Sequence, residues 1–353
     1  MKVQLISPAC KAYKANLHSH STFSDGKLTP EQIKEVYKAR GYQIVAFSDH
    51  EFLIDHSDLS DENFLALTSY EMQIMDMSVP TKAHRKATHL NLFAKKPHNV
   101  SQIFFNPKYF SFGNVPFGKQ ELIPSLKYIG SNEAERYHTI DCINDIIQQA
   151  RDAGFIVCYN HPAWSLVDAG DYTLLRGLFA MEIYNGGCAK LGFTEYSTQA
   201  YDEMLRSGQR IGCVATDDNH NNLPFDNPAS DSFCGFTMVY AKDLSYDSVI
   251  EALECGNYYA STGPTFDEIF YDETGLHVRF SPCTAIKLLT YGRRTEAKWC
   301  KGGDTMTEAD FLIKDTDVYF RLEIIDKFAH RAFSRAYFLN EIPCHPCSSW
   351  YNK

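Results

Sequence analysis

The chain has 353 residues, of which 44% are hydrophobic and 14% aromatic, enough for one large α/β domain or one domain with a smaller companion. Its formal net charge of −10 argues against a general nucleic-acid or membrane-surface binder, because long-range attraction to polyanions would be missing. No apolar run approaches the roughly 20 residues that cross a bilayer.

The cysteines and the first residues bear on the compartment. The 11 cysteines are an odd number scattered singly, which is typical of a reducing compartment rather than of a disulfide framework. Lys11 and Lys14 interrupt what would be the apolar part of a signal peptide. We therefore expect a cytoplasmic protein.

The first chemical motif is the stretch from Leu17 to Gly26, which contains His18, His20 and Asp25. The preceding residues, 13–17, are predicted to form a short strand. Residues two apart in a strand project to the same side, so the two imidazoles can point at one metal ion. Such a histidine pair is a weak signal alone, and its weight depends on the rest of the chain.

A capped helix follows. Thr29 is a suitable N-cap, Pro30 suits the first helical position and Gln32 completes a capping box, and the helix is expected to end near Gly41. A second strand, 43–48, then leads into Asp49-His50.

The same alternation continues along the chain. Further strands are predicted at 64–69, 89–94, 155–159, 180–184, 210–215 and 234–241, and the stretch 258–264 completes the alternating part. Helices are predicted at 140–150, 195–207 and 247–254. Potential ligands stand beside these strands, where Glu71, His161 and Asp217-Asp218-Asn219-His220 follow their strands and His89 leads its own.

This alternation predicts an α/β fold with a parallel sheet, closed into a TIM-like barrel, whose chemistry lies at the carboxyl ends of the strands. Residues 95–137 are expected to be an insertion over the barrel mouth, either a surface loop packed by its own aromatic side chains or a substrate lid. After Pro264 the helices stop, and strands at 266–271, 276–280, 286–291 and 318–325 predict a small all-β C-terminal domain.

Taken in order, the motifs resemble a known family. They are His18-x-His20, Ser24-Asp25-Gly26, Ser48-Asp49-His50, Glu71, His89, His161-Pro162 and Asp218-x-His220. This order resembles the polymerase and histidinol phosphatase (PHP) family of metal-dependent phosphoesterases, over about residues 13–263. The resemblance implies a distorted (β/α)7 barrel spanning 1–263 and, as in the branch with a β appendage, a β-sandwich-like domain spanning 264–353.

The resemblance also implies a cluster of two or three divalent metal ions. His18, His20, Glu71 and Asp218 would hold the first ion, Glu71 would bridge to a second held by His89 and His161, and Asp25, His50 and His220 would hold a third. Many family members have histidine at the position of Asp25. Asp217 is an alternative to Asp218, although the spacing to His220 favours Asp218, and His84 could replace His89.

The chemistry of these residue types agrees with that reading. A bridging carboxylate such as Glu71 sets two ions roughly 3.5–4 Å apart, the spacing that stabilises attacking and leaving oxygens at phosphorus. Mixed nitrogen and oxygen ligation suits Mn, Fe or Zn. The implied catalytic residues are Glu71, His161 and Asp218.

These observations predict a hydrolase that cleaves a small phosphomonoester or phosphodiester, of nucleotide or sugar phosphate type, by attack of metal-bound hydroxide. No long nucleic acid and no membrane partner is expected. An amidohydrolase-like enzyme acting on carbamates or amides is an alternative, but no lysine falls at a strand end, where a carbamylated bridge would be expected. A non-catalytic metal-holding module is a third reading. The metal, the substrate, the oligomeric state and the role of the C-terminal domain stay open.

Overall fold

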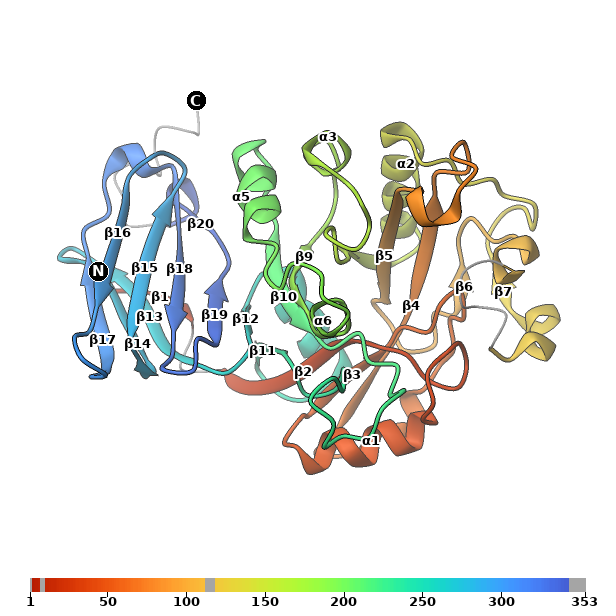
Figure 1. Ribbon diagram of the computed structural model, residues 1–353, viewed down its shortest axis with the longest axis horizontal. Coiled ribbons are helices and arrows are strands. Elements are labelled where there is room, and N and C mark those ends of the chain that lie inside the picture. Colours follow the sequence, from red (N-terminus) through yellow and green to blue (C-terminus); the bar gives the residue numbers. More distant parts are fainter. Residues whose placement is uncertain (1, 7–9, 112–117, 343–353) are drawn as a thin grey trace.

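The computed structural model describes residues 2–6, 10–111 and 118–342. The first part of the chain forms a large, mostly parallel sheet (Figure 1). Its strands pair in the order β10-β9-β8-β5-β4-β3-β2-β11-β12. Their bounds are β2 (Lys11–Ser19), β3 (Ile44–Phe47), β4 (Leu65–Met75), β5 (Ala87–Ala94), β8 (Phe155–Tyr159), β9 (Ala180–Asn185), β10 (Gly212–Thr216), β11 (Phe236–Ala241) and β12 (Tyr258–Ser261).

The prediction of a wholly parallel sheet was wrong at two places. Strand β5 runs antiparallel to both β4 and β8, and β11 runs antiparallel to β2 and β12. The connection between β4 and β5 holds only a short 3-10 turn, η2 (Lys82–His84), and so lacks the helical crossover that a parallel neighbour requires. The chain beyond β10 returns to β2, where the amide of His20 donates to the carbonyl of Asn219 at 3.0 Å.

The helices flank this sheet, and the first follows its sequence signals closely. They are α1 (Pro30–Ala39), α2 (Ile140–Asp152), α3 (Ala169–Tyr172), α4 (Gly186–Lys190), α5 (Thr198–Arg206) and α6 (Tyr246–Glu254). The predicted capping box is present at α1, because the side chain of Thr29 accepts from the amide of Gln32 and the Gln32 side chain accepts from the amide of Thr29. Helix α1 buries Ile33 and Tyr37 against the sheet.

The C-terminal part is antiparallel and carries its own apolar core. One sheet contains β1 (Val3–Ile6), β13 (Phe266–Asp272), β14 (Gly275–Cys283) and β17 (Met306–Phe311). The large sheet continues past β12 through β19 (Arg331–Ser334), β18 (Tyr319–Ile325), β15 (Ala285–Thr290) and β16 (Thr295–Trp299), with β20 (Tyr337–Phe338) on β18. Phe280, Ile286 and Leu322 are buried in the core that these strands share.

The four predicted C-terminal strands are present, but several others escaped the sequence analysis. Strand β16 is half-exposed along its length, so its sequence lacks a clear apolar alternation. Strand β1 lies far from its partner β13 in sequence. The remaining 3-10 turns are η1 (Ser57–Leu59), η3 (Pro107–Ser111), η5 (Gln120–Ser125), η6 (Asp315–Asp317) and η7 (Leu339–Glu341).

The insertion 95–137 packs against the loop that follows β3. It contains β6 (Ser101–Gln102) and β7 (Lys127–Tyr128), and its Phe105 and Phe110 pack with Phe52. The guanidinium of Arg136 forms a two-pronged ion pair with Glu51, at 2.6 and 2.9 Å, and both side chains are buried. This ion pair therefore links the insertion to Glu51, the residue next to His50.

No helix in the described part of the chain is long and apolar enough to cross a membrane.

We expect Arg136→Ala to lower the free energy of unfolding by about 3–5 kcal/mol, because it leaves the Glu51 carboxylate buried without its counter-charge. Urea unfolding of the chelator-treated protein measures this. The control is Lys96→Ala, which removes an exposed ion pair with Asp247 and should cost less than about 1 kcal/mol. Equal midpoints for the two variants would contradict the assignment.

Candidate metal centre

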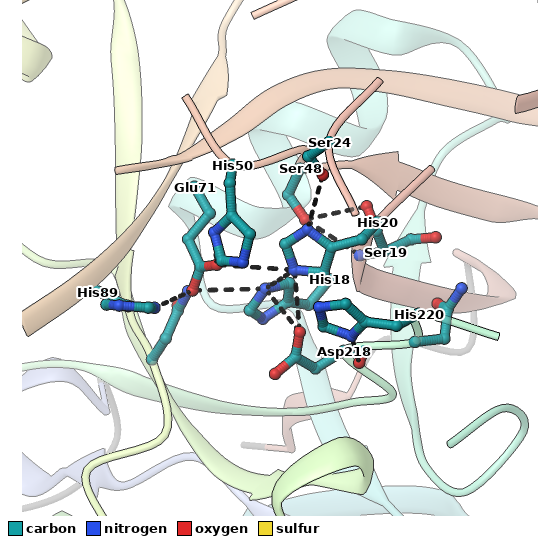
Figure 2. A network of polar contacts seen from close by, with 12 residues as sticks. His18, Ser19, His20, Ser24, Ser48, His50, Glu71, His89, Asp218 and His220 are labelled. Carbon is teal, nitrogen blue, oxygen red and sulfur yellow. Dashed lines mark hydrogen bonds and ion pairs between the residues drawn. The ribbon is translucent and has the colours of Figure 1, made fainter. Parts of the chain in front are cut away.

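The nine residues predicted as metal ligands lie together, each with a side-chain nitrogen or oxygen within 4.0 Å of another member. Figure 2 labels seven of them, all except Asp25 and His161. They come from β2 and the turn after it, the loop after β3, strands β4 and β5, and the segments that follow β8 and β10. The structure therefore brings every predicted ligand to one place.

Glu71 is at the middle of this cluster. Its Oε1 lies 2.9 Å from Nδ1 of His89 and 3.1 Å from Nε2 of His161, and its Oε2 lies 2.8 Å from Nδ1 of His50. The side chain is 1% exposed. Glu71 was expected just after a strand, but it lies within β4, because that strand extends to Met75 by pairing with β5.

Asp218 forms a second focus beside β2. Its Oδ1 lies 3.2 Å from Nε2 of His18 and 2.9 Å from Nε2 of His20, and these two imidazole nitrogens are 3.1 Å apart. Asp25 forms a third focus, where its Oδ2 lies 3.2 Å from Nε2 of His220 and 3.8 Å from Nε2 of His50.

The ligand atoms gather in three overlapping groups. The groups are His18, His20 and Asp218; His50, Glu71 and His89; and His20, Asp25, His50 and His220. The first group lacks Glu71 of the implied first set, and the third adds His20 to the implied third set. The grouping differs in that His50 joins Glu71 and His89, while His161 contacts Glu71 from outside the group.

The donor set fits bound cations. Buried atoms Oδ2 of Asp25, Oε2 of Glu71 and Oδ1 of Asp218 form no well-aligned hydrogen bond within the described residues, although each lies 2.8–3.2 Å from an imidazole nitrogen. A buried carboxylate oxygen without a donor is costly, and a divalent ion with imidazole and carboxylate ligands removes that cost. These residues are therefore chemically suited to hold metal ions.

The pKa values follow from the same crowding. Burial lowers the pKa of His50 and His220, but the carboxylates of Glu71 and Asp25 outweigh it and raise these pKa values to about 9 and about 10. Burial, together with the charges of His50 and His220, lowers the pKa of His20 to about 4. Burial opposes ionisation of Glu71, yet the surrounding histidines hold its pKa well below the usual range. Positive charge around the carboxylates of the cluster therefore stabilises their ionised form.

The two adjacent aspartates have different surroundings. Asp217 accepts from the hydroxyl of Tyr37 at 2.7 Å and from the amides of Phe233, Cys234 and Gly235 at 2.7, 2.8 and 3.0 Å. Burial raises the pKa of Asp217 to about 6, against the effect of these donors. The carboxylate that faces the histidine cluster is that of Asp218. His84 lies exposed in η2, and no described contact joins it to the cluster.

Glu182 is a site residue that the sequence analysis missed. Its Oε1 lies 2.7 Å from Nδ1 of His18 and accepts from the hydroxyl of Thr216, while its Oε2 accepts from the amide of His161 and the side chain of Asn185. Because a carboxylate only accepts, Nδ1 of His18 carries a proton and Nε2 faces the cluster. An acid inside the apolar strand 180–185 was the available signal.

Two amide side chains also donate hydrogen bonds to carboxylates of the cluster. Asn160 donates to Oε1 of Glu71 at 2.8 Å. Asn185 donates to Oδ2 of Asp218 at 3.1 Å and accepts from the amide of Cys188, capping α4. The hydrogen-bonding groups of Asn185 are thus directed at Glu182, Asp218 and the first turn of α4.

The backbone around the cluster is locally strained. His161, Asp218 and Glu51 have positive φ values of 23°, 51° and 60°. Side-chain-bearing residues seldom adopt this region, and where a fold retains such residues they often cluster at functional sites. Gly187 allows a close approach, because a Cβ there would lie 2.9 Å from the carbonyl oxygen of Asp218.

A cavity of about 860 Å³ opens onto the cluster. Its walls include His50, Glu71, His89, His161 and Asp218. No described residue of the insertion 95–137 lines this cavity, so its described residues fit the packed-loop interpretation rather than the substrate lid.

Three solved structures are similar to this chain. A two-domain protein from Bacteroides vulgatus that contains a predicted PHP-like metal-dependent phosphoesterase has 15% identity and a TM-score of 0.44, covering 95% of this chain and 97% of its own. A protein from Bifidobacterium adolescentis assigned as a metal-dependent phosphoesterase has 16% identity and a TM-score of 0.37, covering 70% and 97%. An amidohydrolase from Chromobacterium violaceum has 14% identity and a TM-score of 0.36, covering 61% and 93%.

The sequence matches no protein-family model, and the search of curated proteins finds no match. At these identities and TM-scores the three structural likenesses carry no weight for the reaction. The function of this chain rests on its own residues.

Substitutions of the two adjacent aspartates should separate effects on folding from effects on metal binding. We expect Asp217→Asn to lower the free energy of unfolding by about 1–3 kcal/mol, because an amide group would face buried N–H and O–H donors. Asp218→Asn should leave the chelator-treated protein as stable as the parent but reduce its metal content after reloading and dialysis. Urea unfolding and elemental analysis measure both, and the reverse pattern would make Asp217 the ligand.

Glu182→Gln is expected to weaken metal binding by about 10–100-fold, because His18 loses the acceptor that fixes its ring and tautomer. Titration of the stripped protein with Mn²⁺ or Zn²⁺ measures the affinity. Glu203→Gln is the matched control, since Glu203 accepts from Tyr172 away from the cluster. Unchanged affinity in Glu182→Gln would exclude this orienting role.

Proposed function

We propose that this protein is a metal-dependent phosphoesterase that hydrolyses a small phosphomonoester or phosphodiester. The observation that carries the proposal is the cluster of six histidines around three carboxylates at the floor of a cavity of about 860 Å³. Its ligand atoms lie in overlapping groups that share His20 and His50, which suits adjacent ions rather than isolated ones.

The residues proposed to hold two or three divalent ions, of Mn, Fe or Zn type, are those of the cluster. They are His18, His20, Asp25, His50, Glu71, His89, His161, Asp218 and His220. When bound, such ions supply Lewis acidity toward phosphoryl oxygens and lower the pKa of water near them.

The protein's own side chains would bind the ions and the substrate and orient the residues of the cluster. Glu71, within a strand and between two sets of histidines, is positioned to bridge two ions. Glu182 and Asn185 fix the orientation of His18 and Asp218. Lys82, Arg85 and Lys190 line the same cavity, and their charges favour an anionic substrate in a chain of net charge −10.

The proposed catalytic residues are Glu71, His161 and Asp218. His161 contacts Glu71, lies 4.0 Å from Asp218 and is among the residues that line the cavity. The proposed substrate is a small phosphorylated molecule, because the cavity has the size of a small-molecule site and no described basic groove suits a polymer.

The finer architecture is also a proposal. We infer a distorted (β/α)7 barrel over residues 1–263 and a β-sandwich-like unit over 264–353. The contact between the β10 end and β2, at Ser19 and Asn219, supports closure of the barrel. The β1–β13 pairing means that the first residues pack with the C-terminal unit.

The test is phosphate release by chelator-stripped protein reloaded with Mn²⁺, against mononucleotides, sugar phosphates, cyclic phosphates and short oligonucleotides. We expect metal-dependent turnover of a small ester, and a loss of at least about 100-fold in kcat for Glu71→Gln and Asp218→Ala, because each removes a charged ligand. Glu203→Gln, on the surface, should retain full activity.

Silence across this panel, with metal shown to be bound, would overturn the phosphoesterase proposal in favour of an amide or carbamate hydrolase or a non-catalytic metal-holding module. Turnover that survives Asp218→Ala would refute that residue's assignment.

A further inference from the structure

One wall of the metal-centre cavity is apolar and open to solvent. Leu166, Leu191, Phe193 and Leu223 line it, with 47%, 72%, 37% and 41% of their surfaces exposed. They come from three segments, those that follow β8, α4 and β10. Large apolar side chains that gather exposed around one cavity mark a binding surface more often than scattered ones do.

Trp164 continues this apolar wall down to the metal ligands. It lines the cavity, and its ring centroid lies 4.9 Å from that of His89 and 5.2 Å from that of His161. A ring-sized group beside the metal centre would therefore meet an indole on one side and the leucine and phenylalanine side chains beyond it.

Backbone hydrogen bonds connect the segments that carry these side chains to neighbouring parts of the site. The amide of Ser165 donates to the carbonyl of His161 at 3.2 Å, and Leu166 has a φ of +57°, a strained value for leucine. The amides of Leu191 and Phe193 donate to the carbonyls of Gly187 and Cys188. Backbone hydrogen bonds thus link Ser165, the residue before Leu166, to His161, and link Leu191 and Phe193 to α4.

The size and charge of the cavity further limit which molecules can bind in it. About 860 Å³ is the volume of a site for a whole small molecule and far exceeds a phosphate group. Arg85 donates to the carbonyls of Val79 and Pro80, and Lys190 donates to that of Pro228; neither forms an ion pair with a carboxylate of the described residues, although Asp231 also lines the cavity. The occupant is anionic at the metals and apolar beyond them.

We propose that the substrate is an amphipathic phosphoester whose leaving group carries an apolar ring seated against Trp164, Leu166, Leu191 and Phe193. The phosphoryl half of this statement rests on the proposed function, whereas the apolar half rests on the wall alone. Polyhydroxylated leaving groups such as sugars would leave that wall exposed and are disfavoured.

The test compares ring-bearing with methyl-bearing ligands on the Mn²⁺-loaded protein by calorimetry. One pair is benzylphosphonate and methylphosphonate, which present a phosphate-like anchor. The other pair is phenylacetohydroxamate and acetohydroxamate, which bind metal without any phosphorus. We expect the benzyl member of each pair to bind about 10-fold or more tightly than its methyl partner, as an apolar pocket discriminates by size.

The double variant Leu191→Ser/Phe193→Ser should reduce this preference to about threefold or less, because it removes half of the wall. Leu174→Ser is the matched control, an exposed leucine (51%) that does not line the cavity and should leave the preference unchanged. Metal content and melting temperature, measured in parallel, show that the variants are folded and loaded.

The outcomes separate the two proposals. Equal binding within the hydroxamate pair, or a preference that survives the double variant, overturns the apolar wall even if phosphate esters are hydrolysed. A benzyl preference among hydroxamates, with no phosphonate binding and no phosphate release, supports the wall and overturns the phosphoesterase function. If the double variant fails to fold, the benzyl-to-methyl ratio of the parent protein decides.

Discussion

The Glu71 carboxylate is the group on which the site depends. It is buried in β4 and faces imidazoles of the β3–β4 loop, of β5 and of the β8 end within 3.1 Å. Asp25 and Asp218 add two further buried carboxylates beside it. A buried group of negative charges needs compensation, and protonated histidines or metal ions are the two ways this site can provide it. Imidazole nitrogens from β2, the loop after β3, β5 and the segments after β8 and β10 therefore surround these carboxylates.

A second set of carboxylates keeps the loops in position. Asp49 accepts from the amides and hydroxyls of Ser21 and Ser24, at 2.7–3.1 Å, and so fixes the turn between His20 and Asp25. Glu182 fixes His18 and the segment at His161, and Asp217 fixes the loop 233–235. Both carboxylate oxygens of each of these acids accept hydrogen bonds, so among the described residues the buried carboxylate oxygens without a well-aligned partner are those in the cluster.

The cavity joins two kinds of surface that are chemically opposite. Its floor is a dense polar cluster with buried, unpartnered oxygens, and its outer wall is a row of exposed leucine and phenylalanine side chains. Strained residues occur on both, at His161, Asp218 and Leu166. Strain and exposed apolar surface often occur together at binding sites, which fits the proposed substrate cavity.

Local signals in the sequence predicted the four longer helices, most strands and the histidine and carboxylate residues that gather in the cluster, but not the short helices α3 and α4. The capping box at Thr29, the apolar spacing in 140–152 and the order of the histidine motifs are properties of short stretches, so they could be predicted without neighbours. Tertiary structure alone decided the direction of β5, the extension of β4 past Glu71 and the pairing of β1 with β13. It also decided that Glu182 meets His18 and that four separate apolar residues form one wall. Those features depend on which distant segments pair, and strand pairing is set by burial across the whole sheet rather than by the residues of one strand.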